Sequence, residues 1–218
     1  MLTFCNDIDL LHWEPNILRD AAFASQTLIS GTGNLAGSTF TVASGSFTAA
    51  HVTSDQVIVL TGATAGCYPI VSVDGAAQLT LSVLYDGLFP TSGDPATPSP
   101  PGTATGLTFA VRTFWPQRRI VSELLLQAAG IDPSDPDAEQ KILNPDALKR
   151  PCTLGTLHLI HSALAAAAEE PANLMIRVDL YEKLYRRALR SVTAKLDLNL
   201  DGRLDALRRL NVMDLERV

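Results

Sequence analysis

The chain reads VSVDGAAQLTLSVL over residues 71–84. Within the first half of the chain, this stretch has the clearest sequence pattern for secondary structure. Polar and apolar side chains alternate from Gln78 to Leu84, as they do in a strand that is buried on one face. An Asp-Gly pair between two such runs, here Asp74-Gly75, is typical of a β-hairpin. The stretch therefore predicts two antiparallel strands.

The sequence on either side of this hairpin is nearly free of charge. No Lys, Arg or Glu occurs between Asp20 and Arg112, where Ser, Thr, Gly and Val dominate. From Arg112 onward the chain is rich in Leu, Ala, Arg, Glu and Asp, which indicates a change from β-type to helical sequence. The charged side chains inside the interval are Asp55, Asp74, Asp86 and Asp94.

Short runs of β-branched and aromatic residues predict further strands around the hairpin. Five or so short strands at such spacing are typical of a small barrel or sandwich. Residues 89–106 contain five prolines and predict an exposed, extended and mobile loop. The predicted strands cover residues 39–43, 56–60, 67–73, 78–84 and 107–112.

Helical patterns flank this β segment on both sides. Two short helices are predicted over residues 7–11 and 14–28, with Gly31-Thr32-Gly33 as the linker that follows. Two longer helices with a short break at Pro171 predict an antiparallel helical hairpin. The helices predicted after Arg112 cover residues 116–129, 136–143, 154–168 and 173–192.

These patterns together predict an α+β chain of two domains. Residues 1–29 and 113–218 are expected to form an α-helical domain, an antiparallel helix bundle with a C-terminal partner-binding tail. Residues 30–112 are expected to form a small antiparallel β-barrel or sandwich domain inserted into it. Such insertion is tolerated because the ends of the inserted domain only need to lie close together.

No constellation of residues typical of catalysis is found in the sequence, so we do not expect an enzyme. Cys5, Cys67 and Cys152 lie far apart and lack metal-ligand spacing, and we expect them to act as small apolar residues. His158 and His161 could share a metal on one helix, but no third ligand with characteristic spacing accompanies them. No cofactor and no metal site are predicted.

The segment from Asp197 to Asp205, DLNLDGRLD, has two readings. It matches the first half of a calcium-binding loop, with oxygen-bearing side chains at positions 1, 3, 5 and 9 and glycine at position 6. The twelfth position, which should be a bidentate Glu, is Arg208, so any calcium affinity is expected to be weak. The other reading is a turn that ends the long helix and starts a short one at Leu204.

The C-terminal tail is too short to form a core by itself. It is expected either to dock on its own domain or to bind a partner. The net charge of −6 argues against a protein that grips a nucleic-acid backbone. The first residues lack the basic start and apolar stretch of a signal peptide, and no apolar run is long enough to span a membrane, so synthesis in the cytoplasm is expected.

The helical parts, about half of the chain, resemble the head-to-tail adaptor (connector) proteins of tailed bacteriophages. The N-terminal segments DIDLL (residues 7–11) and EPNILRD (residues 14–20) carry this resemblance. So do the later helical hairpin, with YEKLYRRAL over residues 181–189, and the turn over residues 197–205. The β segment departs from the smallest members of that family, which are almost wholly helical.

The resemblance implies a structural subunit of the phage neck, in the virion at the head–tail junction. Copies of such a protein form a ring, commonly of twelve, that joins the portal protein to the next neck or tail protein. DNA passes through the ring without specific binding. In this family the C-terminal segment reaches towards the portal, so the expected contact residues here are Leu210, Val212, Met213 and Leu215.

Two alternatives remain beside the adaptor. One is another virion structural protein, such as a stopper or tail-completion subunit. The other is a receptor- or glycan-binding module that uses the β segment as its binding head. Exposed aromatic side chains on the β domain would favour the second alternative.

Overall fold

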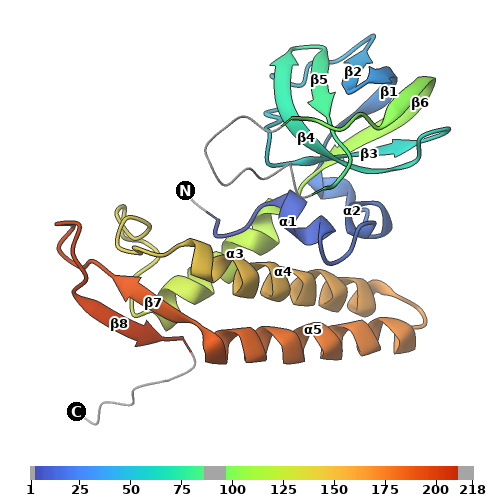
Figure 1. The fold of residues 1–218 in the computed structure, drawn as a ribbon. Coiled ribbons are helices and arrows are strands. Elements are labelled where there is room, and N and C mark those ends of the chain that lie inside the picture. Colours follow the sequence, from blue (N-terminus) through green and yellow to red (C-terminus); the bar gives the residue numbers. More distant parts are fainter. Residues whose placement is uncertain (1–2, 86–96, 211–218) are drawn as a thin grey trace. The chain divides into compact units, whose positions relative to one another are not determined.

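The computed structural model describes residues 3–85 and 97–210, and the chain divides into two compact units (Figure 1). Residues 7–114 form the barrel unit, and residues 1–6 together with residues 115–218 form the helical unit. The division near the N-terminus falls after Asn6, whereas the sequence placed it after residue 29. The first two helices therefore belong to the unit that contains the β-barrel.

In its described part, the barrel unit contains short helical segments and six strands. All strand pairs are antiparallel, and they close a barrel in the order β1-β2-β5-β4-β3-β6. The elements are α1 (Asp7–Leu11), α2 (Ile17–Asp20), a 3-10 helix (Ala24–Gln26), β1 (Thr27–Gly37), β2 (Thr39–Val42), β3 (Val57–Thr61), β4 (Gly66–Gly75), β5 (Gln78–Leu81) and β6 (Gly102–Arg112).

Aromatic rings fill the barrel interior. Phe40, Phe47 and Phe109 are almost completely buried, and their ring centroids lie 5.2–6.5 Å apart. Along β6 the buried positions alternate, so that Leu107, Phe109 and Val111 all face inward. The alternation that predicted the strands is thus the alternation between barrel interior and surface.

Strand β1 was not predicted, because its sequence is rich in glycine. A Cβ atom at Gly33 would lie 2.5 Å from Cζ of Phe40 and 2.7 Å from the carbonyl oxygen of Thr41. A Cβ atom at Gly31 would lie 3.2 Å from Cε1 of Phe109. Glycine is present in this strand because the rings of the core pack directly against its backbone.

The hairpin predicted around Asp74-Gly75 is confirmed as β4–β5, with a shifted turn. Gly75 pairs with Gln78, so the two turn residues are Ala76 and Ala77. The Asp74 carboxylate instead accepts hydrogen bonds from the hydroxyls of Ser72 and Thr80, at 2.6 and 2.7 Å. Asp74 therefore ties the two strands together.

The helical unit contains three longer helices and a small sheet in its described part. Figure 1 shows α4 and α5 running antiparallel, joined by a short connection, as the sequence predicted. β7 and β8 form an antiparallel two-stranded sheet. The elements are α3 (Trp115–Ala128), α4 (Asp146–Ala167), α5 (Ala172–Ser191), β7 (Thr193–Leu196) and β8 (Ala206–Arg209).

The predicted fold class, an antiparallel helix bundle with an inserted barrel or sandwich, is wrong. The fold is α+β, but it consists of a closed six-stranded barrel unit and a unit in which three helices accompany a β-hairpin. Residues 136–143, expected to be helical, form turns and an isolated bridge. Residues 206–209, part of the helix that was expected to start at Leu204, form β8.

Contacts distant in sequence explain why β7 is a strand. The Asn144 side chain donates to the Thr193 carbonyl at 3.0 Å and accepts from the Lys195 N–H at 2.7 Å. The Leu143 N–H donates to the Lys195 carbonyl at 2.9 Å. The segment before α4 therefore pairs with β7, which overrides the helical propensity of this Leu-, Ala- and Arg-rich sequence.

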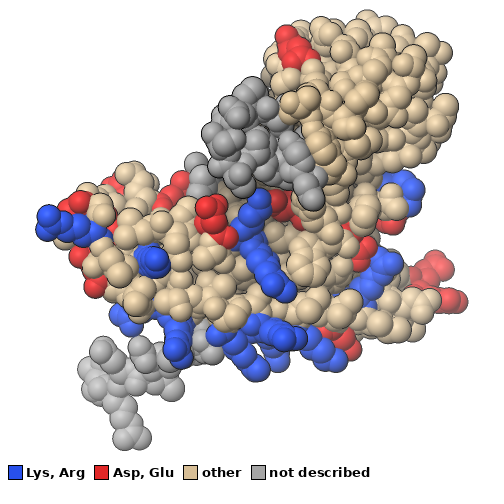
Figure 2. Space-filling view, viewed as in Figure 1, with Lys and Arg blue, Asp and Glu red and all other residues tan. Residues whose placement is uncertain are grey.

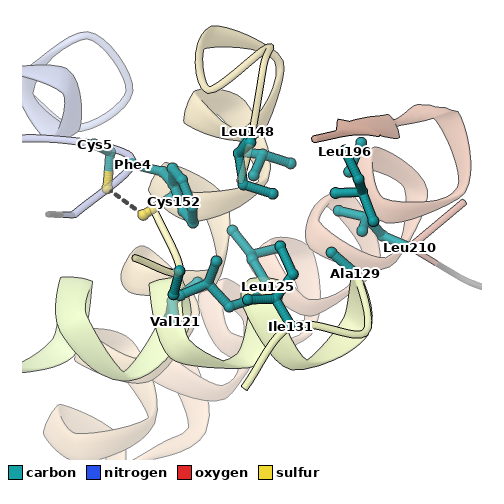
Figure 3. Packing of buried hydrophobic residues seen from close by; sticks show 14 residues of the cluster. Phe4, Cys5, Val121, Leu125, Ala129, Ile131, Leu148, Cys152, Leu196 and Leu210 are labelled. Carbon is teal, nitrogen blue, oxygen red and sulfur yellow. Dashed lines mark hydrogen bonds between the residues drawn. The ribbon is translucent and has the colours of Figure 1, made fainter. Parts of the chain in front are cut away.

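The helical unit has its own hydrophobic core (Figure 3). The N-terminal segment contributes Phe4 and Cys5, although it is distant in sequence from the rest. Ile142 and Leu148 come from the region around the start of α4. The other buried members are Val121, Leu125, Leu126, Ala129, Ile131, Ala138, Cys152, Ala194, Leu196 and Leu210.

Candidate functional site

The outer face of α5 carries a continuous stripe of exposed side chains, which we call the α5 stripe. It consists of Ile176, Leu180, Lys183, Arg187 and Arg190, which recur every three or four residues and so share one helix face. Ile176 is 68% exposed and Leu180 is 49% exposed. The stripe is therefore apolar over the first half of the helix and basic over the second half.

α5 carries more positive charge than its surroundings. It has five basic and two acidic side chains, although the whole chain has a net charge of −6. Figure 2 shows Lys and Arg side chains gathered along the edge of the helical unit where Figure 1 places α5. Arg190, in the last turn, also suits the negative end of the helix dipole.

Packing against α4 fixes the orientation of α5. The imidazole of His161 is 1% exposed and stacks on the ring of Tyr181, with centroids 5.3 Å apart and planes 1° apart. Nδ1 of His158 lies 3.3 Å from the carbonyl oxygen of Val178. Both histidines considered as metal ligands thus serve helix packing, and no group of three potential ligands is placed to hold a metal among the residues that the structure describes.

An open cleft of about 620 Å³ lies elsewhere on the helical unit, between α3 and the turns that follow it. We call it the acidic cleft. Acidic side chains outnumber basic ones in its lining, where Arg119 is the basic member. Apolar and acidic side chains that line it include Glu123, Leu126, Asp132, Pro133, Asp135 and Glu139.

Local hydrogen bonds hold two of the acidic side chains of this cleft, Asp132 and Asp135, in their charged form. The Ser134 backbone and hydroxyl donate to Asp132 and hold the pKa of that carboxyl below its ordinary value. Hydrogen bonds from Lys141 and from the Asp137 backbone do the same for Asp135. The cleft therefore presents a stable negative surface at neutral pH.

The net charge of the chain resides in the barrel unit. Residues 7–114 contain eight acidic and two basic side chains, whereas the helical unit contains fifteen of each. The charges of the helical unit are separated in space, with a basic excess on α5 and an acidic excess at the cleft.

The Asp197–Asp205 segment forms the connection between β7 and β8, so the turn interpretation describes it. The Asp197 carboxylate is buried and accepts from the backbone N–H groups of Asp201 and Gly202, at 3.2 and 2.7 Å. The Asp205 carboxylate accepts from the N–H groups of Leu198 and Asn199. The acidic oxygens thus bond to the backbone of the turn itself, and the turn joins two strands rather than two helices.

We expect the Asp197→Ala substitution to lower the free energy of unfolding of the helical unit by about 1 kcal/mol. The Gly202 N–H loses its acceptor, whereas the Asp201 N–H keeps a second one, the side-chain oxygen of Asn199; the rest of the loop is exposed, so water replaces the lost partner. Urea unfolding followed by circular dichroism measures the loss. The Asp201→Ala variant is the control, since Asp201 accepts a single N–H, from Arg203, and is exposed.

The predicted partner-binding residues fall in two groups. Leu210 is 6% exposed and belongs to the core of the helical unit. A buried side chain offers no surface to a partner, so Leu210 does not enter the contact set proposed below. Val212, Met213 and Leu215 lie outside the described residues.

A buried polar cluster joins the N-terminal segment to α3 and α4, and no sequence pattern indicated it. Sγ of Cys5 lies 2.7 Å from Sγ of Cys152. The Arg118 guanidinium, 1% exposed, donates to the Cys5 carbonyl at 3.0 Å. The Phe4 N–H donates to the Ser122 hydroxyl at 3.1 Å. With 146 residues between the two cysteines, spacing alone could not pair them.

No helix of the described residues is long and apolar enough to cross a membrane. No family model matches the chain, and neither a curated protein nor a solved structure is significantly similar to it.

Proposed function

We propose that the chain is a structural subunit whose copies join head to tail into a ring, as expected of a neck protein between the portal and the tail of a phage. The proposal has two supports: the resemblance of the helical sequence to phage adaptor proteins, and the surface of the helical unit. The surface supports the proposed mode of assembly, and the resemblance supports the proposed place in the particle.

The distribution of exposed apolar side chains carries the proposal. Among the described residues, twelve large hydrophobic side chains are exposed, and all but Trp13 belong to the helical unit. They include Ile176 and Leu180 on the α5 stripe and Ile120 and Leu124 on α3. Exposed apolar side chains that recur along one helix face, as on α5, are typical of protein–protein contacts, so the helical unit is the part that assembles.

Charge decides which surfaces meet. In a ring, one face of each subunit meets a different face of the next subunit. The α5 stripe combines apolar and basic side chains, and the acidic cleft combines apolar and acidic ones. Because both lie on the same unit, the α5 stripe of one copy meeting the acidic cleft of the next gives a repeating heterologous contact.

The barrel does not favour the alternative of a receptor- or glycan-binding module. Such sites present exposed aromatic rings, but Phe40, Phe47 and Phe109 are buried in the barrel core. Tyr68 is partly buried, and its hydroxyl donates to the Thr64 carbonyl at 3.1 Å. Tyr85 is also partly buried, and Phe89 lies outside the described residues.

A charge-swap experiment tests the contact between copies. We expect Arg187→Glu to weaken self-association about tenfold, because one exposed charge pair becomes repulsive. Asp132→Lys should weaken it similarly, because the Asp132 carboxylate lines the acidic cleft, and the double variant should recover most of the loss. Sedimentation velocity across a concentration series of the full chain measures the association.

Arg203→Glu is the matched control, because it changes the net charge equally but lies in the exposed β7–β8 connection. It should associate like the parent protein. A parent chain that stays monomeric at every concentration would contradict self-assembly. Single variants that associate normally, or a double variant that remains as weak as the singles, would contradict the pairing of these two surfaces.

Immunogold electron microscopy with an antibody against the barrel unit tests the place of the protein in the particle. Label at a single vertex, where head and tail meet, is the expected result. Label at the tail tip would assign the chain to receptor binding, and unlabelled particles would remove it from the virion.

A further inference from the structure

Two cysteines that are distant in sequence meet inside the helical unit (Figure 3). Cys5 precedes α1, and Cys152 lies in the second turn of α4. Their sulfur atoms are 2.7 Å apart, whereas a disulfide bond is about 2.05 Å long. The sulfurs therefore need to approach by about 0.65 Å to form a bond.

The contact is held from both sides. The segment that carries Cys5 is fixed to α3 through its backbone: the Arg118 guanidinium donates to the Cys5 carbonyl, and the Phe4 N–H donates to Ser122. Cys152 is fixed by its position within α4, where it is fully buried. The backbone contacts of the N-terminal segment and the position of Cys152 in α4 thus hold the two sulfurs close together.

We propose that Cys5 and Cys152 form a reversible disulfide when the protein meets a small disulfide such as oxidised glutathione. The two protein thiols are oxidised, one sulfur–sulfur bond forms between them, and the sulfur–sulfur bond of glutathione is reduced. The protons of the two cysteines pass to the two glutathione thiolates that leave. The proposal does not depend on ring assembly.

The two thiols take different parts in this exchange. Burial, together with the hydrogen bond to Cys152, raises the pKa of Cys5. Burial also opposes ionisation of Cys152, but hydrogen bonds from Cys5, Ser122 and Thr156 and the charge of Arg118 hold its pKa below the ordinary value. In the second step Cys5 no longer carries a thiol proton, and the charge of Arg118 and the hydrogen bonds from Ser122 and Thr156 remain to stabilise the Cys152 thiolate that attacks.

Access for the oxidant comes from the N-terminal side. Cys5 sits on a short segment ahead of α1, and local opening of such a segment exposes its thiol and relieves the burial that raises its pKa. Glutathione then forms a mixed disulfide with Cys5. As the segment closes, the Cys152 thiolate attacks the sulfur of Cys5 and expels the second glutathione.

The bond would enclose the entire barrel unit within one covalent loop, because residues 7–114 lie between the two cysteines. Cross-links that close long loops restrict the unfolded chain most. For a chain of this length we expect the oxidised protein to melt on the order of 10 °C above the reduced protein.

Mass spectrometry of the full-length protein tests the proposal. The reduced protein is equilibrated with oxidised glutathione, denatured in iodoacetamide and digested. We expect one peptide pair joined through Cys5 and Cys152 and lighter by two hydrogen atoms, with Cys67 alkylated. Dithiothreitol should abolish both the joined peptide and the rise in melting temperature.

Alkylation of all three cysteines after this treatment would overturn the proposal. So would lasting glutathione adducts on Cys5, or a cross-link that involves Cys67. Cys67→Ser is the matched control and should leave the cross-link unchanged, whereas Cys5→Ser and Cys152→Ser should each lose the melting shift. The measurement on the parent protein decides the question even if a serine variant does not fold.

Discussion

The Phe109→Ala substitution is expected to lower the free energy of unfolding of the barrel unit by about 3–5 kcal/mol. Phe109 is 2% exposed, and its ring lies 5.2 Å from that of Phe40 and 5.8 Å from that of Phe47. Removing the ring leaves a cavity at the centre of the three aromatic residues. The closed barrel resists collapse into that space, which places the cost at the upper end for core truncations.

The position of Phe109 in the sheet adds to this effect. β6 pairs with β1 on one side and with β3 on the other, so that Phe109 lies opposite both Gly31 and Leu60. Loosening β6 therefore weakens its pairing with β1 and with β3 at the same time. The ring also covers the backbone of β1 at Gly31, and its loss exposes that strand to water.

Hydrogen–deuterium exchange measured peptide by peptide provides the test, because it reports each unit separately. Peptides from β1, β3 and β6 should lose protection in Phe109→Ala, while those from α4 and α5 keep theirs. Phe23→Ala is the control: Phe23 is half-buried and makes one edge-on ring contact, with Phe114 at 6.2 Å. Equal protection of the barrel in both variants would contradict a core role for Phe109.

The barrel strands could be predicted where burial of one strand face produces an alternation of polar and apolar residues in the sequence. Residues 78–81 alternate in sequence because Leu79 and Leu81 face the interior, and the same holds for β6. β1 shows no such alternation. Its glycines are determined by Phe40 and Phe109, which approach from strands that are distant in sequence. A single local window contains no information about that approach.

The helical unit shows the same limit at its β-hairpin. The sequence predicted a turn over residues 197–205 and a short helix from Leu204, where helix-forming residues follow. The hydrogen bonds of Asn144 with Thr193 and Lys195 select the strand instead. The spacing of the α5 stripe, in contrast, is visible in the sequence, because its residues recur every three or four positions along one predicted helix.

The candidate site was predicted only in part for a similar reason. The sequence placed the contact residues in the C-terminal tail, whereas Leu210 folds back into the core formed with Leu196. The acidic cleft depends on turns that were expected to be a helix, so its lining residues could not be grouped beforehand. The Cys5–Cys152 contact joins two segments with 146 residues between them, so no local sequence pattern indicates it.

Gly155→Leu is expected to lower the free energy of unfolding of the helical unit by about 3 kcal/mol, at the upper end for overpacked cores. Gly155 lies in the middle of α4, where the helix contacts both α3 and α5. A Cβ atom there would lie 2.8 Å from Cγ1 of Val121 and 3.0 Å from Cε2 of Tyr185. A leucine adds three further carbon atoms to that crowded space, so the helices must move apart.

A comparison of alanine with leucine at position 155 separates this packing effect from the effect of helix propensity. Glycine in a helix costs about 1 kcal/mol relative to alanine, so Gly155→Ala gains propensity while it loses space. We expect the alanine variant to fall between the parent and the leucine variant. Ala163→Leu adds a leucine to an exposed position of the same helix and should be nearly neutral. Urea unfolding followed by helical circular dichroism compares the three variants.

Equal stability of Gly155→Leu and Ala163→Leu would show that α4 does not need close approach at Gly155. The expected loss has a consequence for assembly, because the ring of Tyr185 on α5 packs against Gly155. Displacing α5 shifts the α5 stripe on its opposite face. Self-association should therefore weaken in Gly155→Leu even under conditions where the chain stays folded, and it should be unchanged in Ala163→Leu.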